Sequence, residues 1–441
     1  MKRTFHIINW LLAVSLFMAF NYFPLVGGIM IVLEAVLLLA KRDLRIPKHL
    51  IPACLMAIAL VGGMFVHRYS IRMVFAVVAC LCALCLLILD IRESKKRRHK
   101  IISIIGYAGL GFSAICACLL LYNVLNPDAL MIMGCQGGDT SYPANVQETH
   151  EMIDDIEVFQ DVTYTSAYPN NTYTVYHVPE NRGVFFYIHG GGLVGGDKHS
   201  TAQDKYLFSM MDAGYSVVTV DYVLAPQNPF PQSVHEVNDA LAYFIRHCDA
   251  YGLSADRIIV GGDSAGGMLS GLLAVVNTNP DYAAEMGIVP AISGTEVTLK
   301  GYISIAGLVD VPRFGNTGNF AVDWFFDTMG RSAFQNADYA CSDDAHLGSV
   351  LEHVTADFPP SYLSDGNLGT FTDQGTDLAA RLNELGVPVE TNFLDRSHGV
   401  LFHTWELDTA SEQGAENFAK TIAFLDSLSA STSEDAKGQM P

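Results

Sequence analysis

Positive charge is scarce in most of this 441-residue chain. Residues 126–441 carry 12 Lys and Arg against 42 Asp and Glu, whereas residues 1–125 carry 14 against 4. A surface with such an acidic excess repels the phosphate backbone of DNA and RNA. The composition of the larger part therefore excludes nucleic acid as a partner.

Cysteine is equally scarce in the larger part, where three of the nine cysteines lie. These three are Cys135, Cys248 and Cys341, which can form at most one disulfide. The other six fall in apolar stretches near the N-terminus, where cysteine acts as a small apolar residue. Cysteine usage therefore does not decide the redox compartment.

The first 125 residues have almost no acidic side chains and contain long apolar runs. These runs occupy residues 7–23, 24–40, 50–66, 73–89 and 101–125. Each is about as long as a helix must be to cross the ~30 Å hydrocarbon core of a bilayer. The pattern predicts a transmembrane region of five helices, or of four if residues 5–39 form one helix without a break at Pro24. A lipid bilayer is therefore an expected partner.

Basic residues are distributed unevenly between the loops of this region. With five helices, the N-terminus and the basic loops at 41–48 and 92–100 lie on one side. Because positively charged loops remain in the cytoplasm, this arrangement places the chain after residue 125 outside the cytoplasmic membrane. The predicted spans contain few polar groups besides Glu34, which favours an anchor over a transport pathway.

From residue 156 onward, short β-rich runs come first and then alternate with helical patterns. Strands are expected at 157–165, 172–178, 183–188, 216–221, 257–261, 301–305, 361–364 and 389–393, and helices at 201–213, 232–249, 264–277, 374–386 and 412–429. Such an order predicts an α/β domain whose sheet becomes parallel and is covered on both faces. We expect this domain to span 156–429, with 126–155 as a linker or lid, 306–355 as a cap insertion and 430–441 as a flexible tail.

One strand–helix junction reads Gly-Asp-Ser-Ala-Gly at residues 262–266. A serine before a helix can be a simple N-cap. However, the G-x-S-x-G pattern between an apolar strand and a helix is also typical of a nucleophile held on a sharp turn. The stretch lacks the G-x-G-x-x-G and Gly-Lys-Ser/Thr patterns of nucleotide-binding loops. Ser264 is therefore the candidate nucleophile.

A second signal, His-Gly-Gly-Gly at 189–192, follows another expected strand. Enzymes that transfer acyl groups need backbone N–H groups directed at the developing oxyanion, and glycine allows a substrate to come close to them. The N–H of the residue after the nucleophile contributes to the same site. We therefore expect Gly190, Gly191 and Ala265 to form an oxyanion hole.

The two motifs together resemble those of hormone-sensitive-lipase-like esterases with the α/β-hydrolase fold. The segment VVTVDYVLAPQNPFPQSV between them is similar to the same family, and the resemblance covers about residues 155–428. It implies an α/β-hydrolase fold, a Ser-acid-His triad in that chain order, and no metal or organic cofactor. GGDK at 195–198 resembles the related formamidase and feruloyl-esterase branch.

The base is expected after the last strand of such a fold. His398 lies just beyond the strand at 389–393 and is followed by Gly399, as in the family's His-Gly pattern. His403 is the alternative, although its neighbours indicate the start of a helix. The sequence therefore favours His398.

The acid is where the sequence departs from the family, because Gly369 occupies the usual aspartate position. Asp365 lies at the end of the expected strand, where sheet enzymes place catalytic side chains. Asp373 begins the next helix and can equally be a helix cap. Asp365 is the preferred acid and Asp373 the alternative.

These residues predict a membrane-anchored serine esterase or lipase-like hydrolase that cleaves short-to-medium acyl or acetyl esters through an acyl-enzyme. Its partner would be a small-molecule ester. The aromatic residues of the cap, such as Trp324, Phe325 and Phe326, either line an acyl pocket or pack the cap onto the core. The alternatives are a formamidase-type amide hydrolase and a catalytically silent binding ectodomain.

Overall fold

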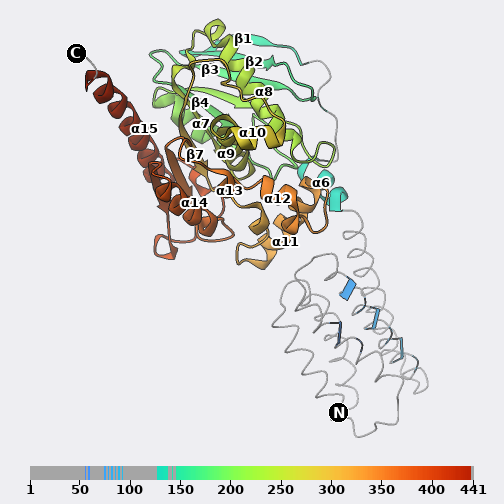
Figure 1. Ribbon diagram of the computed structural model, residues 1–441. Coiled ribbons are helices and arrows are strands. Elements are labelled where there is room, and N and C mark those ends of the chain that lie inside the picture. The colour runs from blue at the N-terminus through green and yellow to red at the C-terminus, as the bar shows by residue number, and fades with distance from the viewer. Residues whose placement is uncertain are drawn as a thin grey trace. The chain divides into compact units, whose positions relative to one another are not determined.

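The computed structural model describes residues 127–137, 142 and 146–438, together with scattered positions between 55 and 92 (Figure 1). The predicted transmembrane region at 1–125 therefore lies almost entirely outside the described residues. None of the helices in the described part is both long and apolar enough to cross a membrane. The chain divides into two compact units, Met1–Leu130 and Met131–Pro441. The second unit contains all the predicted site residues.

The second unit is built on a sheet that has nine strands within the described residues, in the order β1-β2-β3-β5-β4-β6-β7-β8-β9. The strands are β1 (Thr149–Ile153), β2 (Ile156–Thr163), β3 (Thr172–His177), β4 (Val184–Ile188), β5 (Ser216–Val220), β6 (Ile258–Asp263), β7 (Leu299–Ile305), β8 (Ser361–Asp365) and β9 (Val389–Phe393). In this order, the pairs β1–β2, β2–β3 and β3–β5 are antiparallel. The remaining pairs, from β5–β4 to β8–β9, are parallel. The predicted mostly parallel sheet is thus confirmed.

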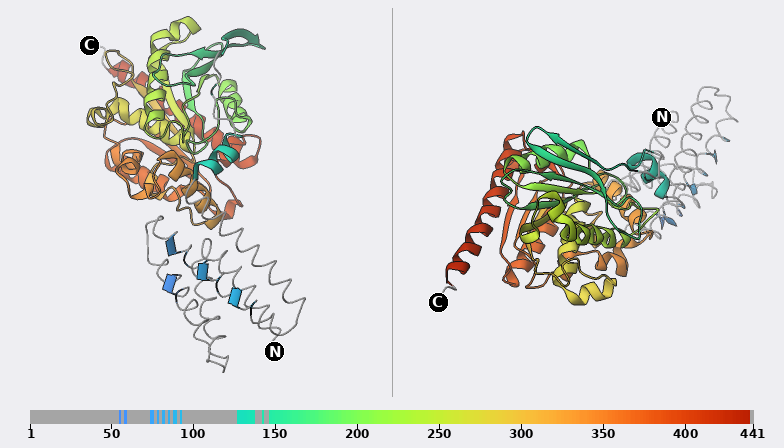
Figure 2. Two further views of the ribbon diagram at one scale, coloured as in Figure 1. Left: turned by 90° about the vertical axis from the view of Figure 1, so that its right-hand side faces the viewer. Right: turned by 90° about the horizontal axis from the view of Figure 1, so that it is seen from above.

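Helices cover both faces of the sheet because the buried strands are apolar on both sides. Alternate residues of β4 point into different cores: Phe186 belongs to the cluster that residues of α8 (Gln232–His247), α9 (Ala265–Thr278) and α14 (Thr372–Glu384) share. Phe185 and Tyr187 belong instead to the cluster that residues of α7 (Thr201–Asp212) and α15 (Glu412–Gly438) share. In the right-hand view of Figure 2 the red helix α15 lies on one side of the strands and the yellow-green helices on the other.

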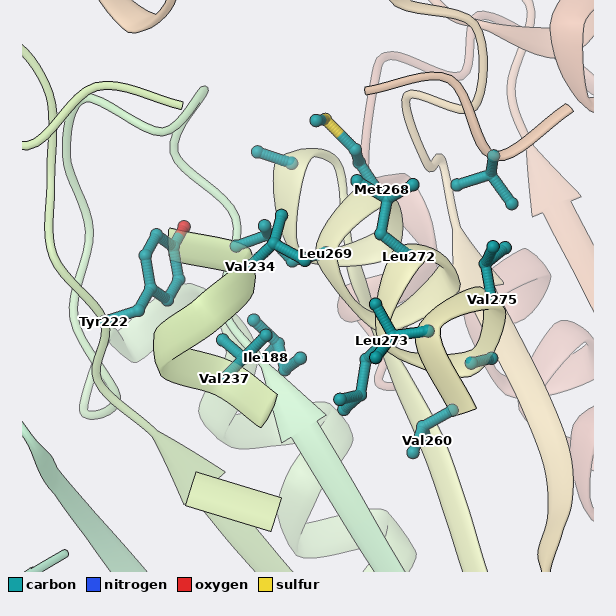
Figure 3. Close-up of a cluster of buried hydrophobic side chains, with 14 of the residues drawn as sticks. Ile188, Tyr222, Val234, Val237, Val260, Met268, Leu269, Leu272, Leu273 and Val275 are labelled. Atoms are coloured by element: carbon teal, nitrogen blue, oxygen red, sulfur yellow. The ribbon is translucent and has the colours of Figure 1, made fainter. Parts of the chain in front are cut away.

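Helix α9 is the most deeply buried helix near the expected nucleophile. All of its residues from Ala265 to Asn277 are buried, and only the last residue, Thr278, is partly exposed. Figure 3 shows Leu269 and Leu273 of α9 packed beside Val234 and Val237 of α8 and above Ile188 of β4. This packing fixes the start of α9, and with it the β6–α9 turn.

The segment 126–155 differs from the expected linker or lid. It contains α6 (Pro127–Cys135) and β1, which pairs with β2 and so belongs to the sheet. The expected cap insertion contains α11 (Phe320–Ala333), α12 (Asp343–Leu347) and α13 (Val350–His353). Another short helix, α10 (Pro280–Met286), lies in a stretch that the sequence analysis left without an element. Helix α15 continues into the expected tail as far as Gly438.

Candidate active site

The β6–α9 turn holds Ser264 in a conformation that few non-glycine residues adopt. Its φ is 53° and its ψ is −118°, outside the regions that L-residues normally occupy. Backbone hydrogen bonds support this conformation from both sides: the Ser264 N–H donates to Ile305 (2.9 Å), and its carbonyl accepts from Leu308 (3.1 Å). The side chain stands at the end of β6 and is 8% exposed. This is the strained strand-to-helix turn on which hydrolases of this fold hold a nucleophile.

Glycines on either side of the nucleophile allow strand and helix to approach each other. A Cβ at Gly262 or at Gly266 would clash with the Ile188 carbonyl at the end of β4. The G-x-S-x-G spacing therefore has a steric reason in this chain.

The imidazole of His403, and not that of His398, contacts the nucleophile. Nε2 of His403 lies 2.8 Å from Oγ of Ser264. His398 is exposed, and its Nδ1 lies 3.2 Å from the carboxylate of Asp395 in the same turn. The choice of His398 as the base is therefore corrected, and the alternative histidine takes its place.

Aromatic side chains surround the His403 ring. The rings of Phe326 from α11 and Phe371 before α14 meet it edge-on, with centroids 5.4 and 5.1 Å away. Burial lowers the pKa of His403 to about 4, because an apolar environment disfavours the charged imidazolium. At neutral pH the ring is therefore uncharged and able to accept a proton at Nε2. Its Nδ1 is buried and has no hydrogen-bond partner within the described residues.

The oxyanion-hole prediction holds for fewer residues than expected. The N–H of Gly190 donates to Oδ1 of Asp263 at 2.8 Å, so it is not directed at a substrate. The N–H groups of Gly191 and Ala265 have no hydrogen-bond partner in the described part of the chain. Gly191 has a φ of 117°, which favours glycine. The expectation that Gly190 belongs to the oxyanion hole is therefore corrected, because its N–H binds Asp263. Gly191 and Ala265 remain candidates for the oxyanion hole.

Asp263, the residue before the nucleophile, connects the two motifs. Besides Gly190, its Oδ1 accepts a hydrogen bond from the Tyr187 hydroxyl at 2.5 Å. The side chain lies in the interior, and burial raises its pKa, while the two donors oppose that shift. The same carboxyl group thus fixes the start of the His-Gly-Gly-Gly loop relative to the β6–α9 turn.

A buried lysine fixes the other end of that loop. Nζ of Lys198 forms ion pairs with Asp221 after β5 (2.5 Å) and with Asp161 of β2 (2.8 Å), and the lysine is only 5% exposed. Removing one partner of such a buried pair leaves an uncompensated charge. The GGDK segment therefore anchors the loop that carries Gly191.

Two carboxyl groups are buried near the site, at Asp365 and Glu406. Asp365 ends β8 and accepts hydrogen bonds from the N–H groups of Gly366 (2.7 Å) and Phe371 (2.6 Å). Glu406, in the turn at Trp405–Leu407, has neither carboxyl oxygen within hydrogen-bond distance of a partner in the described residues. Burial raises the pKa of both groups, and the charge of Asp365 raises that of Glu406 further.

The alternative acid, Asp373, is near enough for its charge to add slightly to the rise that burial causes in the pKa of Asp365, but its side chain faces the surface. It is an exposed residue in the first turn of α14 and pairs with Arg313 at 3.2 Å. Arg313 also pairs with Asp310 and Asp377. Asp373 thus belongs to a surface ion-pair network, and the structure does not place it with Ser264 and His403.

Glu406 was not predicted, and His403 was only the second choice, because the loop after β9 is longer than the His-Gly pattern suggests. The chain stays at the surface through residues 395–400 and returns to the interior only at Glu406 and Leu407. The signal in the sequence is the change from the polar stretch DRSHG to the apolar stretch VLF, just before His403.

Comparisons with known proteins agree with this architecture. A family model described as alpha/beta hydrolase fold matches residues 185–402. An esterase of Gibberella moniliformis is 28% identical over 257 residues, which cover 57% of this chain and 78% of that protein. An acetyl esterase of Salmonella schwarzengrund is 25% identical over 242 residues, covering 55% and 72%. Human hormone-sensitive lipase is 37% identical, but over only 118 residues, 26% of this chain and 11% of the lipase.

Among solved structures, esterase B from Lactobacillus rhamnosis superposes with a TM-score of 0.55 at 20% identity. The superposition covers 70% of this chain and 93% of that enzyme. The predicted α/β-hydrolase fold is therefore confirmed for the second unit, and its hydrolase domain is similar to the hormone-sensitive-lipase-like esterases.

Proposed function

We propose that this α/β hydrolase is a serine esterase that cleaves short-to-medium acyl or acetyl esters through an acyl-enzyme. The observation that carries the proposal is the 2.8 Å contact between His403 Nε2 and Ser264 Oγ. A nucleophile within hydrogen-bond reach of a base is the arrangement that covalent catalysis requires. The relatives that carry the name esterase support the same class of reaction.

In the first step, Oγ of Ser264 attacks the ester carbonyl while its proton passes to Nε2 of His403. The carbonyl oxygen becomes an oxyanion, which accepts hydrogen bonds from the N–H groups of Gly191 and Ala265. The C–O bond to the alcohol then breaks, and His403 returns the proton to the leaving oxygen. Water hydrolyses the acyl-enzyme by the same sequence, with His403 again as the base.

Asp365 is the acid in this proposal. It lies at the carboxyl end of β8, as a triad acid does, and its two backbone donors stabilise the ionised form. A carboxylate oxygen can accept more than one hydrogen bond. Asp365 can therefore keep its backbone contacts and still receive the Nδ1–H of His403 when the imidazolium forms.

Ester turnover by the full chain in detergent tests the proposal. We expect hydrolysis of p-nitrophenyl acetate and butyrate, and a loss of at least about 10³-fold in kcat for Ser264→Ala and for His403→Ala. His398→Ala is the matched control, because that histidine is exposed and does not contact Ser264. It should keep kcat within about twofold, in the range of surface substitutions.

Two results would contradict the proposal. One is a folded wild-type chain that hydrolyses none of the esters. The other is a Ser264→Ala variant that keeps wild-type turnover.

The membrane anchor is a separate part of the proposal, and the composition of residues 1–125 supports it. Their apolar runs and basic loops are typical of membrane helices. We expect the expressed chain to sediment with membranes and to stay there after alkaline carbonate extraction. Release of the chain into the supernatant by carbonate would refute the anchor and leave the esterase proposal unaffected.

A further inference from the structure

The loop that carries the candidate base has no core packing of its own. After β9 the chain runs along the surface, and no residue from Leu394 to Phe402 is buried. Segments with few buried apolar contacts open locally at low free-energy cost. The His403 ring itself packs on Phe326 and Phe371, but the loop that leads to it needs other contacts to hold its course.

One side chain, Asn367, contacts this loop at four points. Its Nδ2 lies within hydrogen-bond distance of three carbonyl oxygens, those of Leu394 (3.2 Å), Asp395 (3.0 Å) and Gly399 (3.1 Å), which share its two N–H groups. Its Oδ1 accepts from the N–H of Leu401 at 3.2 Å. The amide group thus uses both its donors and its acceptor on a single segment.

The backbone around Asn367 reinforces these contacts. The N–H of Asn367 donates to the Leu401 carbonyl at 2.9 Å, and Leu368 forms a β-bridge with Phe402, the residue before the base. Gly366 lets the two segments approach, since a Cβ there would press on the same Leu401 carbonyl. The turn after β8 and the loop after β9 are therefore tied together from Leu394 to Phe402.

We propose that Asn367 is a positioning residue, whose side chain holds the 394–402 loop so that His403 stays aligned with Ser264. The proposal rests on the proposed esterase function. Asn367 itself touches neither the nucleophile nor the base in any hydrogen bond of the structure; it acts through the loop backbone. It follows Asp365 by two residues, so the same short turn holds the candidate acid and fixes the candidate base.

A matched control exists on helix α8, which packs beside α9 (Figure 3). Asn238 of α8 binds another loop in the same way: its Nδ2 donates to Val289 at 2.9 Å, and its Oδ1 accepts from Ala291 at 3.0 Å. The loop it holds contains none of the site residues. Replacing Asn238 therefore removes two hydrogen bonds of an asparagine side chain to a loop, against four at Asn367, without disturbing the base.

The test compares Asn367→Ala, Asn367→Asp and Asn238→Ala in the full chain. We expect Asn367→Ala to lower kcat for p-nitrophenyl butyrate by about 10- to 100-fold, because a misplacement of about 1 Å has effects of that size. KM should change by less than about threefold, since ester binding does not need the base. Asn367→Asp should be at least as damaging, because its carboxylate faces three carbonyl oxygens.

Asn238→Ala should keep kcat within about twofold of wild type, even where it lowers the melting temperature as much as Asn367→Ala does. An equal fall in kcat in Asn238→Ala and Asn367→Ala would overturn the proposal, because the effect would then be a general loss of stability. A rise in KM with unchanged kcat in Asn367→Ala would overturn it too.

Amide hydrogen exchange gives a readout that does not depend on turnover. The Leu401 amide donates to Asn367 Oδ1, so its exchange should accelerate in Asn367→Ala and stay unchanged in Asn238→Ala. If the wild-type chain hydrolyses no ester, the proposed function fails, whereas this exchange pattern would still show that Asn367 holds the 394–402 loop. Equal exchange of the Leu401 amide in wild type, Asn367→Ala and Asn238→Ala would overturn the positioning role of Asn367, whatever the activity.

Discussion

Asp365 and Glu406 place two carboxyl groups in the interior, where they are 2% and 0% exposed. Two like charges in one buried site cannot both ionise at low cost. The two N–H groups that bind Asp365 favour its charged form, whereas both oxygens of Glu406 lack a partner at hydrogen-bond distance in the described residues. Burial raises the pKa of Asp365 to about 7, so we expect the pair to carry its one negative charge on Asp365 above about that pH, with Glu406 protonated.

Amide isosteres separate the two roles. Asp365→Asn should lower kcat by at least about 10²-fold, because it removes the charge that supports the His403 imidazolium. Glu406→Gln should cost less than about 10-fold, because a neutral group replaces a neutral group. A larger loss in Glu406→Gln than in Asp365→Asn would identify Glu406 as the acid instead.

The pH profile of kcat/KM checks the same assignment. Its acidic limb reports the protonation of His403, whose pKa burial lowers. In the proposed triad an ionised Asp365 at Nδ1 raises that pKa again. In Asp365→Asn only the lowering effect remains, so the limb of the residual activity should move to lower pH than in wild type. Rates measured between about pH 4 and pH 8 would show the shift. An unchanged limb would mean that the carboxylate of Asp365 does not interact with the base.

The choice between two histidines shows what local sequence pattern leaves undetermined. His398 and His403 both follow β9 within a short distance, and the His-Gly pair favoured the first. The structure places the second at Ser264 because the loop is held by Asn367, a residue more than 25 positions earlier. A contact of that kind depends on the fold and is not visible in the pattern around either histidine.

At the scale of elements, α11 closes one side of the site. Phe326 packs on the His403 ring, and Met329 of the same helix lies so close to Gly192 that a Cβ there would clash with its sulfur. Val322 of α11 would likewise meet a Cβ at Gly369, the position where the family has its acid. The helix therefore occupies the space beside the base and the oxyanion loop.

We expect Phe326→Leu to shift the enzyme towards longer acyl chains. A smaller side chain leaves room beside the imidazole, so the ratio of kcat/KM for hexanoate to that for acetate should rise by about three- to tenfold. Phe325→Leu is the control, because Phe325 is 38% exposed on the same helix. An unchanged ratio in Phe326→Leu, or an equal rise in both variants, would show that Phe326 does not limit the acyl chain.

The strands and helices from β2 onward could be predicted because burial makes their patterns strong. Central strands such as β4 and β6 are apolar on both faces, and α8 shows a clear apolar face. Strand β1 was missed because all five of its residues are exposed, which leaves no alternation to detect. The helices α10, α12 and α13 have too few turns to give a periodic signal. Helix α11 has 14 residues and was not predicted either.

At the scale of the whole molecule, chain order alone predicted much of the architecture. Strand–helix alternation after β4 requires parallel pairing with crossovers, and parallel pairing places the ends of β4, β6 and β8 at one edge of the sheet. Gly191, Ser264 and Asp365 come together there for that reason. The base could not be predicted in the same way, because it lies on a loop rather than at the end of a strand.

The backbone of Ser264 sets stability and turnover against each other. Holding a serine at a φ of 53° and a ψ of −118° costs on the order of 1–3 kcal/mol of strain, which the unfolded chain does not bear. The buried helix α9 and the bonds to Ile305 and Leu308 maintain that conformation. The fold is consequently less stable than its packing alone would make it. At this one residue, selection for a more stable protein and selection for a reactive one act in opposite directions.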